Sequence, residues 1–390
     1  MGKFADFIKK VDAYFFSAVT RSARMFYKQD RAQRFFENLL EMKLASNQGE
    51  LPRRTTEGLA GYRATWGVVP ASVSKLRIHT GAIADGVEYS FVWGSLASDA
   101  NVDTLYESIY DNSLLLLCED GFLKSADTWA NNNAPERFRQ GCSCVIDSRG
   151  YYFDATRPTA IEQMLNNPEI KLDEAQLARA RRLIDLIVEK KLTKYNHQPI
   201  REPMIGRIGS RKVLVVDQSY GDFSISRGWA TDETFKRMLN DAINDNPDSD
   251  IIVKTHPDTM TGKRAGYFQN VPEGGRVFRM TEPINPYSLI NVCDRVYVCS
   301  TQFGFEALMA GKEVHVYGMP FYAGWGLTND RQKNPRRVMR RSLEEVFYIF
   351  YILYTHWCNP DTGSACEIEE AIDWLLRIRK EYSDYKCEHR

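Results

Sequence analysis

The sequence lacks an excess of charge of either sign. Its 390 residues include 51 lysines and arginines and 51 aspartates and glutamates, so the formal net charge with neutral histidine is zero. Proteins that bind nucleic acid through its phosphates depend on a surplus of basic residues, and this balance gives no support for a nucleic-acid partner. Any basic binding site must therefore be local.

Long apolar runs are also missing. No stretch approaches the ~18 to 20 consecutive apolar residues that cross a bilayer. Residues 1–10 mix charged and apolar side chains where a secretory signal would have a clean apolar core. The composition, 43% hydrophobic and 26% charged, is typical of a soluble globular protein. We therefore expect a cytoplasmic protein with at most a peripheral contact with the inner membrane.

Cysteine does not occur in the spacing of a metal site. The eight cysteines are scattered, and only Cys142 and Cys144 stand close together. Without paired CxxC motifs or a His/Cys ligand spacing, we expect reduced, buried thiols and no structural zinc. Residues 248–250 (DSD) have the look of metal ligands, but they open a predicted strand and so lie at the wrong edge of its sheet.

Two common phosphate-binding signatures are absent as well. Neither GxxxxGK[ST] nor GxGxxG follows a predicted strand, which argues against nucleoside triphosphate and dinucleotide enzymes. What the chain does contain is three apolar strands, 213–216, 251–254 and 295–299, each followed at once by polar residues. Ligands of open parallel sheets bind beyond the carboxyl ends of the strands, so the three polar ends should meet at one crevice.

The order of predicted elements indicates an α/β protein. From residue 211 onward, strands 212–217, 250–255, 276–279, 294–299 and 313–317 alternate with helices 231–246, 285–292 and 303–310. This alternation predicts a doubly wound domain. Upstream, the pattern predicts strands at 87–94 and 113–118, a hairpin of 144–147 with 150–154, and helices at 159–166 and 173–191.

We predict a GT-B-like fold, in which two Rossmann-type domains face a central cleft. The expected divisions are a helical segment 1–66, an acceptor-side α/β domain 67–200, a nucleotide-sugar-binding domain 201–335, and C-terminal helices 336–390 that cross back. The linker is 195–209, with two prolines and two glycines, and the last helices are 340–357 and 366–380. The glycine- and aromatic-rich loop 318–328 is of the kind that closes over a ligand.

Residues 4–44 have helical periodicity and an excess of basic side chains. One interpretation is a helix that binds a membrane surface or a partner protein. The other is a helical hairpin that packs on the main body.

Four polar positions are the candidates for chemistry, and each has a purely structural alternative. Glu119 ends a buried strand and is either a catalytic carboxylate or a helix cap. Asp222 is either a turn residue that bonds its own backbone or a nucleophile or base. His256, ahead of a proline, is either structural or a phosphate or base contact. Ser300, with the hydroxyl after it, either caps a helix or binds one phosphate at the helix terminus.

Six motifs taken together resemble one family. They are EDGFLKS at 119–125, DSRGYYFDATRP at 147–158, DQSYGDFS at 217–224, KTHPD at 254–258, STQFGFEA at 300–307 and YAGWGLT at 322–328. In this order, over about residues 87–360, they look like the bacterial capsule and O-antigen β-Kdo transferases of the KpsC and WbbB type. Lys124 stands where the family pattern leads us to expect arginine, which keeps the charge but loses the forked geometry.

The resemblance implies a retaining glycosyltransferase. Such an enzyme takes Kdo (3-deoxy-D-manno-oct-2-ulosonic acid) from CMP-β-Kdo and delivers it to a glycan or glycolipid acceptor of a surface polysaccharide. Asp222 would be the nucleophile and Glu119 a second essential carboxylate. The donor-binding set implied by the motifs is His256, Pro257, Ser300, Thr301, Glu306, Gln218 and Gln302.

Charge suggests three further contacts. Lys124, Arg157 and Lys254 are candidates to neutralise the Kdo carboxylate. CMP leaves with a single phosphate, which a helix terminus and hydroxyls can stabilise, so no metal is expected. Other polysaccharide assembly proteins are expected partners at the membrane. Two alternatives stay open, namely an epimerase-like enzyme on another nucleotide sugar and a non-catalytic glycan-binding subunit.

Overall fold

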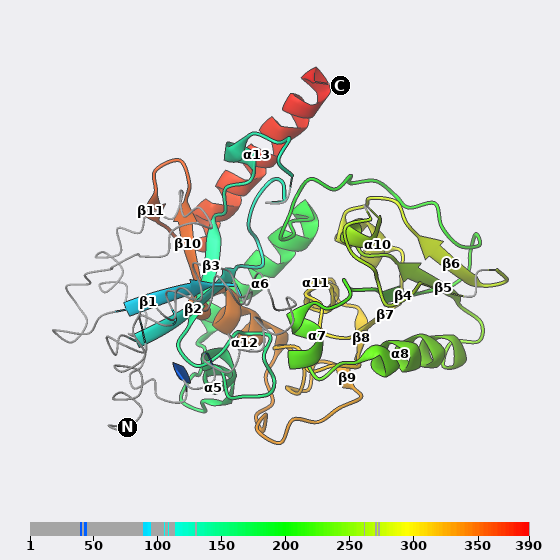
Figure 1. Ribbon diagram of the computed structural model, residues 1–390, viewed down its shortest axis with the longest axis horizontal. Helices are drawn as coiled ribbons and strands as arrows, with labels where there is room; N and C mark the ends of the chain where they lie inside the picture. The colour runs from blue at the N-terminus through cyan, green and yellow to red at the C-terminus, as the bar shows by residue number, and fades with distance from the viewer. Residues whose placement is uncertain are drawn as a thin grey trace, which may run out of the picture.

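A computed structural model of the protein describes most of the chain from residue 114 onward, together with short pieces before it (Figure 1). The described residues are 40, 43, 44, 89–94, 105, 108, 114–128, 131–260, 262–269, 271 and 274–389. The predicted helical segment 4–44 therefore lies outside the described residues, except for three positions near its end. One of these, Leu40, is buried against Val92 and Leu115.

The C-terminal sheet is parallel, as predicted, and has six strands, of which the sequence analysis predicted five. Its order is β6 (Val277–Met280), β5 (Asp250–Lys254), β4 (Lys212–Val216), β7 (Arg295–Val298), β8 (Glu313–Val316) and β9 (Asn329–Asp330). The helices between the strands are α7 (Phe223–Arg227), α8 (Asp232–Asn244), α9 (Pro257–Met260), α10 (Pro286–Asn291) and α11 (Phe303–Met309). Continuous apolar strands suit such a sheet because both faces are covered.

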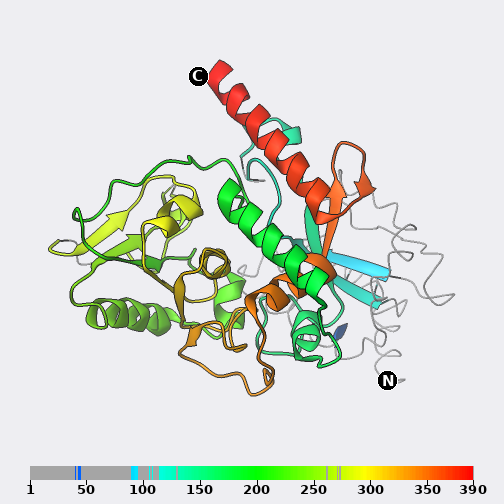
Figure 2. The ribbon, with the colours of Figure 1, turned by 180° about the vertical axis from the view of Figure 1, so that it is seen from behind.

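Alternate residues of these strands enter different cores. Val213 and Val215 pack with α8, whereas Leu214 and Val216 pack on the opposite face with α10 and α11. This second core continues without a break into the N-terminal half, where it includes Phe122 and much of α6 (Glu174–Lys190). Figure 2 shows α6 between the two sheets. The halves therefore share one hydrophobic core across the predicted linker.

The N-terminal sheet has a different construction. Its order is β1 (Tyr89–Trp93), β2 (Leu114–Asp120), β3 (Ser143–Asp147), β10 (Thr355–Asn359) and β11 (Ser364–Ala365). Within the described part of this N-terminal sheet, β1 and β2 are parallel, and the other strand pairs are antiparallel. The α/β class is confirmed, but the described part of this sheet is mixed and not of the Rossmann type.

The predicted hairpin of 144–147 with 150–154 is wrong. The Asp147 carboxylate accepts the backbone N–H groups of Arg149 (2.7 Å) and Gly150 (3.2 Å), which turns the chain out of the sheet directly after β3. Strand β3 pairs instead with β2 on one side and, on the other, with β10 from far along the chain. The predicted helices nearby are confirmed as α5 (Ala160–Asn166), capped by Thr159, and α6, capped by Asp173.

The C-terminal region departs from the predicted pair of helices. The first is α12 (Leu343–Phe347) followed by a π-helical segment, Tyr348–Tyr354, and it ends there because Thr355 is extended and pairs with Val145 in the sheet. The second, α13 (Ile368–Glu388), is longer than predicted. It packs along the N-terminal half, where Arg379 donates to the Lys190 carbonyl at 2.7 Å.

The glycine- and aromatic-rich loop 318–328 is not a lid. Phe321, Tyr322 and Trp325 are buried in the shared core, and the Trp325 indole N–H donates to the Phe321 carbonyl at 2.7 Å. Its aromatic residues therefore fill space between elements, and the prediction that it closes over a ligand is wrong.

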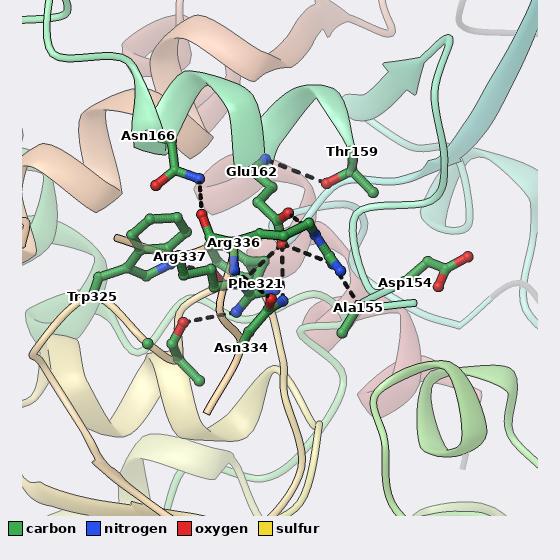
Figure 3. Close-up of polar contacts among 12 residues, drawn as sticks. Asp154, Ala155, Thr159, Glu162, Asn166, Phe321, Trp325, Asn334, Arg336 and Arg337 are labelled. Carbon is green, nitrogen blue, oxygen red and sulfur yellow. Dashed lines mark hydrogen bonds and ion pairs between the residues drawn. The ribbon is translucent and has the colours of Figure 1, made fainter. Parts of the chain in front are cut away.

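A buried carboxylate joins this loop to α5. Glu162, only 3% exposed, accepts from Arg336 at 2.6 Å, from Arg337 at 3.1 Å and from Asn334 at 3.2 Å (Figure 3). Arg337 also donates to the Ala323 carbonyl of the loop at 2.7 Å. The segment after the C-terminal sheet is thereby held against the N-terminal half.

Replacing Glu162 by alanine should destabilise the protein by about 3–5 kcal/mol, because it leaves the buried Arg337 guanidinium without its counter-charge. Urea unfolding monitored by circular dichroism measures the loss. Glu233→Ala, which removes the exposed ion pair with Lys236 on α8, is the matched control and should cost less than about 1 kcal/mol. Equal losses in the two variants would contradict the role given to Glu162.

Candidate functional site

The three polar strand ends lie together at the carboxyl edge of the C-terminal sheet. After β4, the Gln218 side-chain amide donates to the Ser300 hydroxyl at 3.2 Å, and its carbonyl accepts the Ser300 N–H at 3.0 Å. Ser219 is hydrogen-bonded to Nδ1 of His256 at 2.8 Å. The expected meeting of the ends of β4, β5 and β7 is therefore present.

His256 is held in one tautomer. The backbone N–H of Asp258 donates to Nδ1 at 3.1 Å, so the ring proton resides on Nε2. Burial lowers the pKa of His256, although the charges of Asp258 and Asp222 oppose this shift. Pro257 begins α9 directly after the histidine. The neutral ring can thus offer an Nε2–H donor to a ligand.

The turn into α11 is partly engaged by its own helix. Thr301 Oγ1 accepts the Phe303 N–H at 3.3 Å, and the Thr301 carbonyl accepts the Tyr322 hydroxyl at 2.6 Å. A Cβ at Gly304 would overlap that hydroxyl, so glycine is required for this close packing. The N-cap residue of α11 is Gln302, without a side-chain capping hydrogen bond, and the Ser300 hydroxyl is bonded to Gln218, so the predicted capping role of Ser300 is wrong. Binding of a phosphate here stays a prediction.

Gln302 connects this turn to the end of β2. Its amide donates to the Phe122 carbonyl at 2.9 Å and to the Glu306 carboxylate at 3.1 Å. Glu306 is only 4% exposed, and burial raises its pKa to about 8. Its contact with a ribose therefore stays a prediction, while its observed partner is Gln302.

Asp222 caps a helix that the sequence did not predict. Its Oδ1 accepts the Ser224 N–H at 2.9 Å at the start of α7, so the local backbone role is real. None of the residues that the structure describes forms a hydrogen bond with the second oxygen, Oδ2. The negative charge of Asp222 raises the pKa of both Glu119 and His256.

Glu119 stands at the end of β2, paired with Val145 of β3. Burial raises its pKa to about 7; the charge of Lys194 opposes the shift, and Asp120 and Asp222 add to it. A carboxyl group with this pKa can exchange a proton near neutral pH. The helix-cap alternative does not apply, because the residue belongs to a strand.

Lys194 is the functional candidate that the sequence did not reveal. It lies directly before the predicted linker 195–209, and its carbonyl accepts the N–H groups of Lys124 and Ser125 at 3.1 and 3.2 Å. The Lys194 ammonium lies 3.9 Å from Oδ2 of Asp120, the residue that follows Glu119. The sequence of this segment has no helical or strand periodicity. Its backbone partner is distant, because the isolated bridge joins Tyr195 to Ser125, some 70 residues earlier.

The predicted basic residues already have protein partners. Lys124 forms an ion pair with Asp120 at 2.6 Å, and Arg157 with Asp154 at 3.4 Å. The Lys254 ammonium donates to the Thr255 carbonyl at 2.7 Å, and burial lowers its pKa to about 8. Contact of any of them with a sugar carboxylate stays a prediction.

Tyr152 marks the place where the charged groups converge. Burial raises the pKa of its phenol; Lys194 opposes the shift, and the charges of Glu119, Asp222 and Asp120 add to it. Its ring packs edge-on against Phe122, at a centroid distance of 5.4 Å.

Metal ligands do not cluster here. Across the described part of the chain, no three or more His, Cys, Asp or Glu side chains form a group that could hold a metal. Asp250, of the DSD motif, lies at the amino end of β5 and pairs with Arg207 at 2.7 Å.

All eight cysteines are free and six are buried, as expected. None of the helices that the structure describes is long and apolar enough to span a bilayer.

Comparison with known proteins identifies relatives in polysaccharide synthesis. Residues 204–357 match the family model "Capsule polysaccharide biosynthesis protein". The chain is 38% identical over 271 residues to the capsule polysaccharide modification protein LipA of Neisseria meningitidis serogroup A, a match that covers 67% of this chain but only 38% of LipA. It is 36% identical to the lipopolysaccharide-processing protein LpsZ of Rhizobium meliloti, over 65% of this chain and 57% of LpsZ.

Solved structures extend the likeness to the fold. The Thermosulfurimonas dismutans KpsC β-Kdo 2,4 transferase is 35% identical, with a TM-score of 0.66 over 73% of this chain and 86% of that one. The β-Kdo 2,7 transferase of the same organism is 28% identical, with a TM-score of 0.55 over 76% and 86%. With six sequence motifs in order and this fold, the chain belongs to the KpsC-type family of capsule Kdo transferases.

Proposed function

We propose that this protein is a retaining β-Kdo glycosyltransferase, which transfers Kdo from CMP-β-Kdo to a glycan or glycolipid acceptor of a surface polysaccharide. The observation that carries the proposal is the hydrogen bond from the Gln302 amide to the Phe122 carbonyl at 2.9 Å, which joins the turn before α11 to the segment that follows Glu119. Double displacement requires one carboxylate that acts as the nucleophile and a second group that takes the proton of the acceptor hydroxyl. The two-domain GT-B arrangement with a cleft between the halves is part of this proposal.

In the first step, Asp222 attacks the anomeric carbon of Kdo. Its Oδ1 is fixed by the Ser224 N–H, which leaves Oδ2 to form the bond. The bond between that carbon and the phosphate oxygen breaks, and its electron pair leaves with CMP. The Nε2–H of His256 and the hydroxyls of Ser300 and Thr301 are the donors that would stabilise the phosphate charge. No divalent cation is needed to neutralise one phosphate in this way.

In the second step, an acceptor hydroxyl displaces Asp222 from the same carbon, so the original configuration returns. Glu119 takes the hydroxyl proton as general base. Its pKa of about 7 suits the task, since the group is ionised in a large fraction of molecules at neutral pH and can still release the proton afterwards. We place the enzyme in the cytoplasm, at the membrane face where glycolipid acceptors and assembly proteins meet it.

Asp222→Asn should abolish transfer while the fold survives. Asparagine caps a helix as well as aspartate does, so α7 keeps its first-turn hydrogen bond, but the amide is no nucleophile. We expect kcat to fall by on the order of a thousandfold or more, with unchanged thermal unfolding and CMP binding. Mass spectrometry of Kdo addition to a glycan acceptor measures the rate. Undiminished turnover would remove Asp222 from the mechanism.

The pH profile should report Glu119. A base must be ionised, so kcat/KM should fall as the pH drops below about 7, the value to which burial raises the pKa of this carboxyl group. Glu119→Gln should lower activity and remove this acidic limb. The exposed Glu189→Gln on α6 is the control and should leave the profile unchanged. A limb that persists in Glu119→Gln would assign it to another group.

His256→Ala should weaken CMP binding by about tenfold to a hundredfold, since a hydrogen bond to a charged phosphate is lost. Isothermal titration calorimetry with CMP measures the affinity. His389→Ala, at the exposed end of α13, serves as the control. If both variants bind CMP as tightly as the wild type, His256 does not contact the nucleotide.

A further inference from the structure

The short helix α7 begins at the carboxylate to which we assign the nucleophilic attack. Asp222 is joined to this helix twice, because its Oδ1 accepts the Ser224 N–H at 2.9 Å and its carbonyl accepts the Ile225 N–H at 3.0 Å. The helix ends at Arg227, and the Gly228 N–H closes its last turn on the Ser224 carbonyl at 3.0 Å. Since successive helical residues have a fixed rise and rotation, the position of Arg227 determines that of Asp222.

Arg227 is bound to the N-terminal half through both its side chain and its backbone. Its guanidinium donates to Oδ2 of Asp154 at 2.6 Å, and its carbonyl accepts the Ala155 N–H at 2.9 Å. The side chains of Asp154 and Arg227 are 1% and 13% exposed, so solvent ions screen this pair little. The Ala155 carbonyl is itself held by Arg336 at 2.6 Å. Two bonds therefore fix the end of α7 on a rigid part of the N-terminal half.

The Asp154 carboxylate is oriented by its own turn. Its Oδ1 accepts both the N–H and the hydroxyl of Thr156, at 2.9 and 2.5 Å, which directs Oδ2 to Arg227. Arg157 Nε lies 3.4 Å from the same Oδ2. If the charge of Arg227 is removed, Asp154 thus keeps a second cation and is not left as an unpaired buried charge.

The same helix also contacts the turn that precedes α11. A Cβ at Gly228 would lie 2.9 Å from Cβ of Ser300, so glycine is required for this close approach. The Gly228 carbonyl accepts the Met319 N–H at 2.7 Å. At the start of the helix, Phe223 packs against the apolar cluster of the N-terminal half that includes Phe153. Figure 1 shows α7 between the two halves, and these contacts join it to both.

We propose that Arg227 is a positioning residue, which sets the Asp222 carboxylate by docking α7 on Asp154. The inference rests on the proposed function, because it takes Asp222 as the nucleophile. An attacking atom must lie about 3–3.5 Å from the carbon that it attacks, and a displacement of about 1 Å can lower the rate a hundredfold. Arg227 acts through the helix and not on the substrate.

Arg227→Met keeps the aliphatic stem and the backbone bonds but removes the ion pair. We expect kcat to fall by about tenfold to a hundredfold. The KM for CMP-Kdo and the inhibition by CMP should stay unchanged, because Ser300 keeps its two bonds to Gln218. Arg227→Lys, which restores a cation, should recover part of the rate. The control is Arg237→Met on α8, which removes an exposed ion pair with Asp241 and should behave as the wild type.

A double-mutant cycle tests whether Arg227 acts through Asp154. Asp154→Asn keeps an oxygen for the two bonds from Thr156 but removes the charge, and it should also lower kcat. If the two residues act as one unit, the double variant loses no more activity than Arg227→Met alone. Losses that multiply would show that Arg227 acts on another group, such as the substrate, and would overturn the proposal.

The outcomes separate the positioning role from the proposed function. If the wild type binds CMP but transfers no Kdo to a glycan acceptor, the proposed function fails. If the wild type transfers Kdo and Arg227→Met keeps its kcat, the positioning role is overturned and the function stands. A lower kcat that comes with weaker CMP binding or earlier thermal unfolding, and without recovery in Arg227→Lys, would be a general effect on the fold. That result also overturns the positioning role.

Discussion

The buried carboxylate of Glu162 is the interaction on which the arrangement of the site depends. It forms ion pairs with two arginines of one short segment, and each arginine then reaches a different part of the protein. Arg336 donates to the Ala155 carbonyl at 2.6 Å, beside the turn that carries Tyr152. Arg337 holds the loop whose Tyr322 packs against the start of α11. Through these contacts, the buried Glu162 carboxylate and its two arginines hold chain segments on both sides of the candidate active site.

The candidate site contains charged side chains of opposite sign that are partly withdrawn from water. Withdrawal from water raises the pKa of Glu119 into the range where a carboxyl group can act as a base near neutral pH, and Lys194 limits that rise. The same withdrawal keeps His256 neutral, with its proton on the nitrogen away from Ser219. Burial thus prepares two groups for opposite tasks, one to take a proton and one to donate a hydrogen bond.

Local signals predicted the parallel sheet well. Continuous apolar runs gave all five longer strands, and the predicted helices 159–166 and 173–191 are present as α5 and α6. The failures have a common cause, since each involved a partner distant in sequence. Residues 355–357, the first part of β10, were predicted as the end of helix 340–357, and only β3, some 210 residues earlier, makes them extended. Loop 318–328 was predicted as a lid because its buried neighbours could not be foreseen.

By itself, the sequence determined the elements whose causes are local, namely the strands, the caps and the polar residues that follow β4, β5 and β7. It also fixed the family, through motifs in a set order. Only the tertiary structure decided which charges meet. The pairing of Lys194 with the end of β2, the burial of Glu306 and the raised pKa of Glu119 all depend on distances through space and on exclusion of water. Neither quantity is encoded in the order of neighbouring residues.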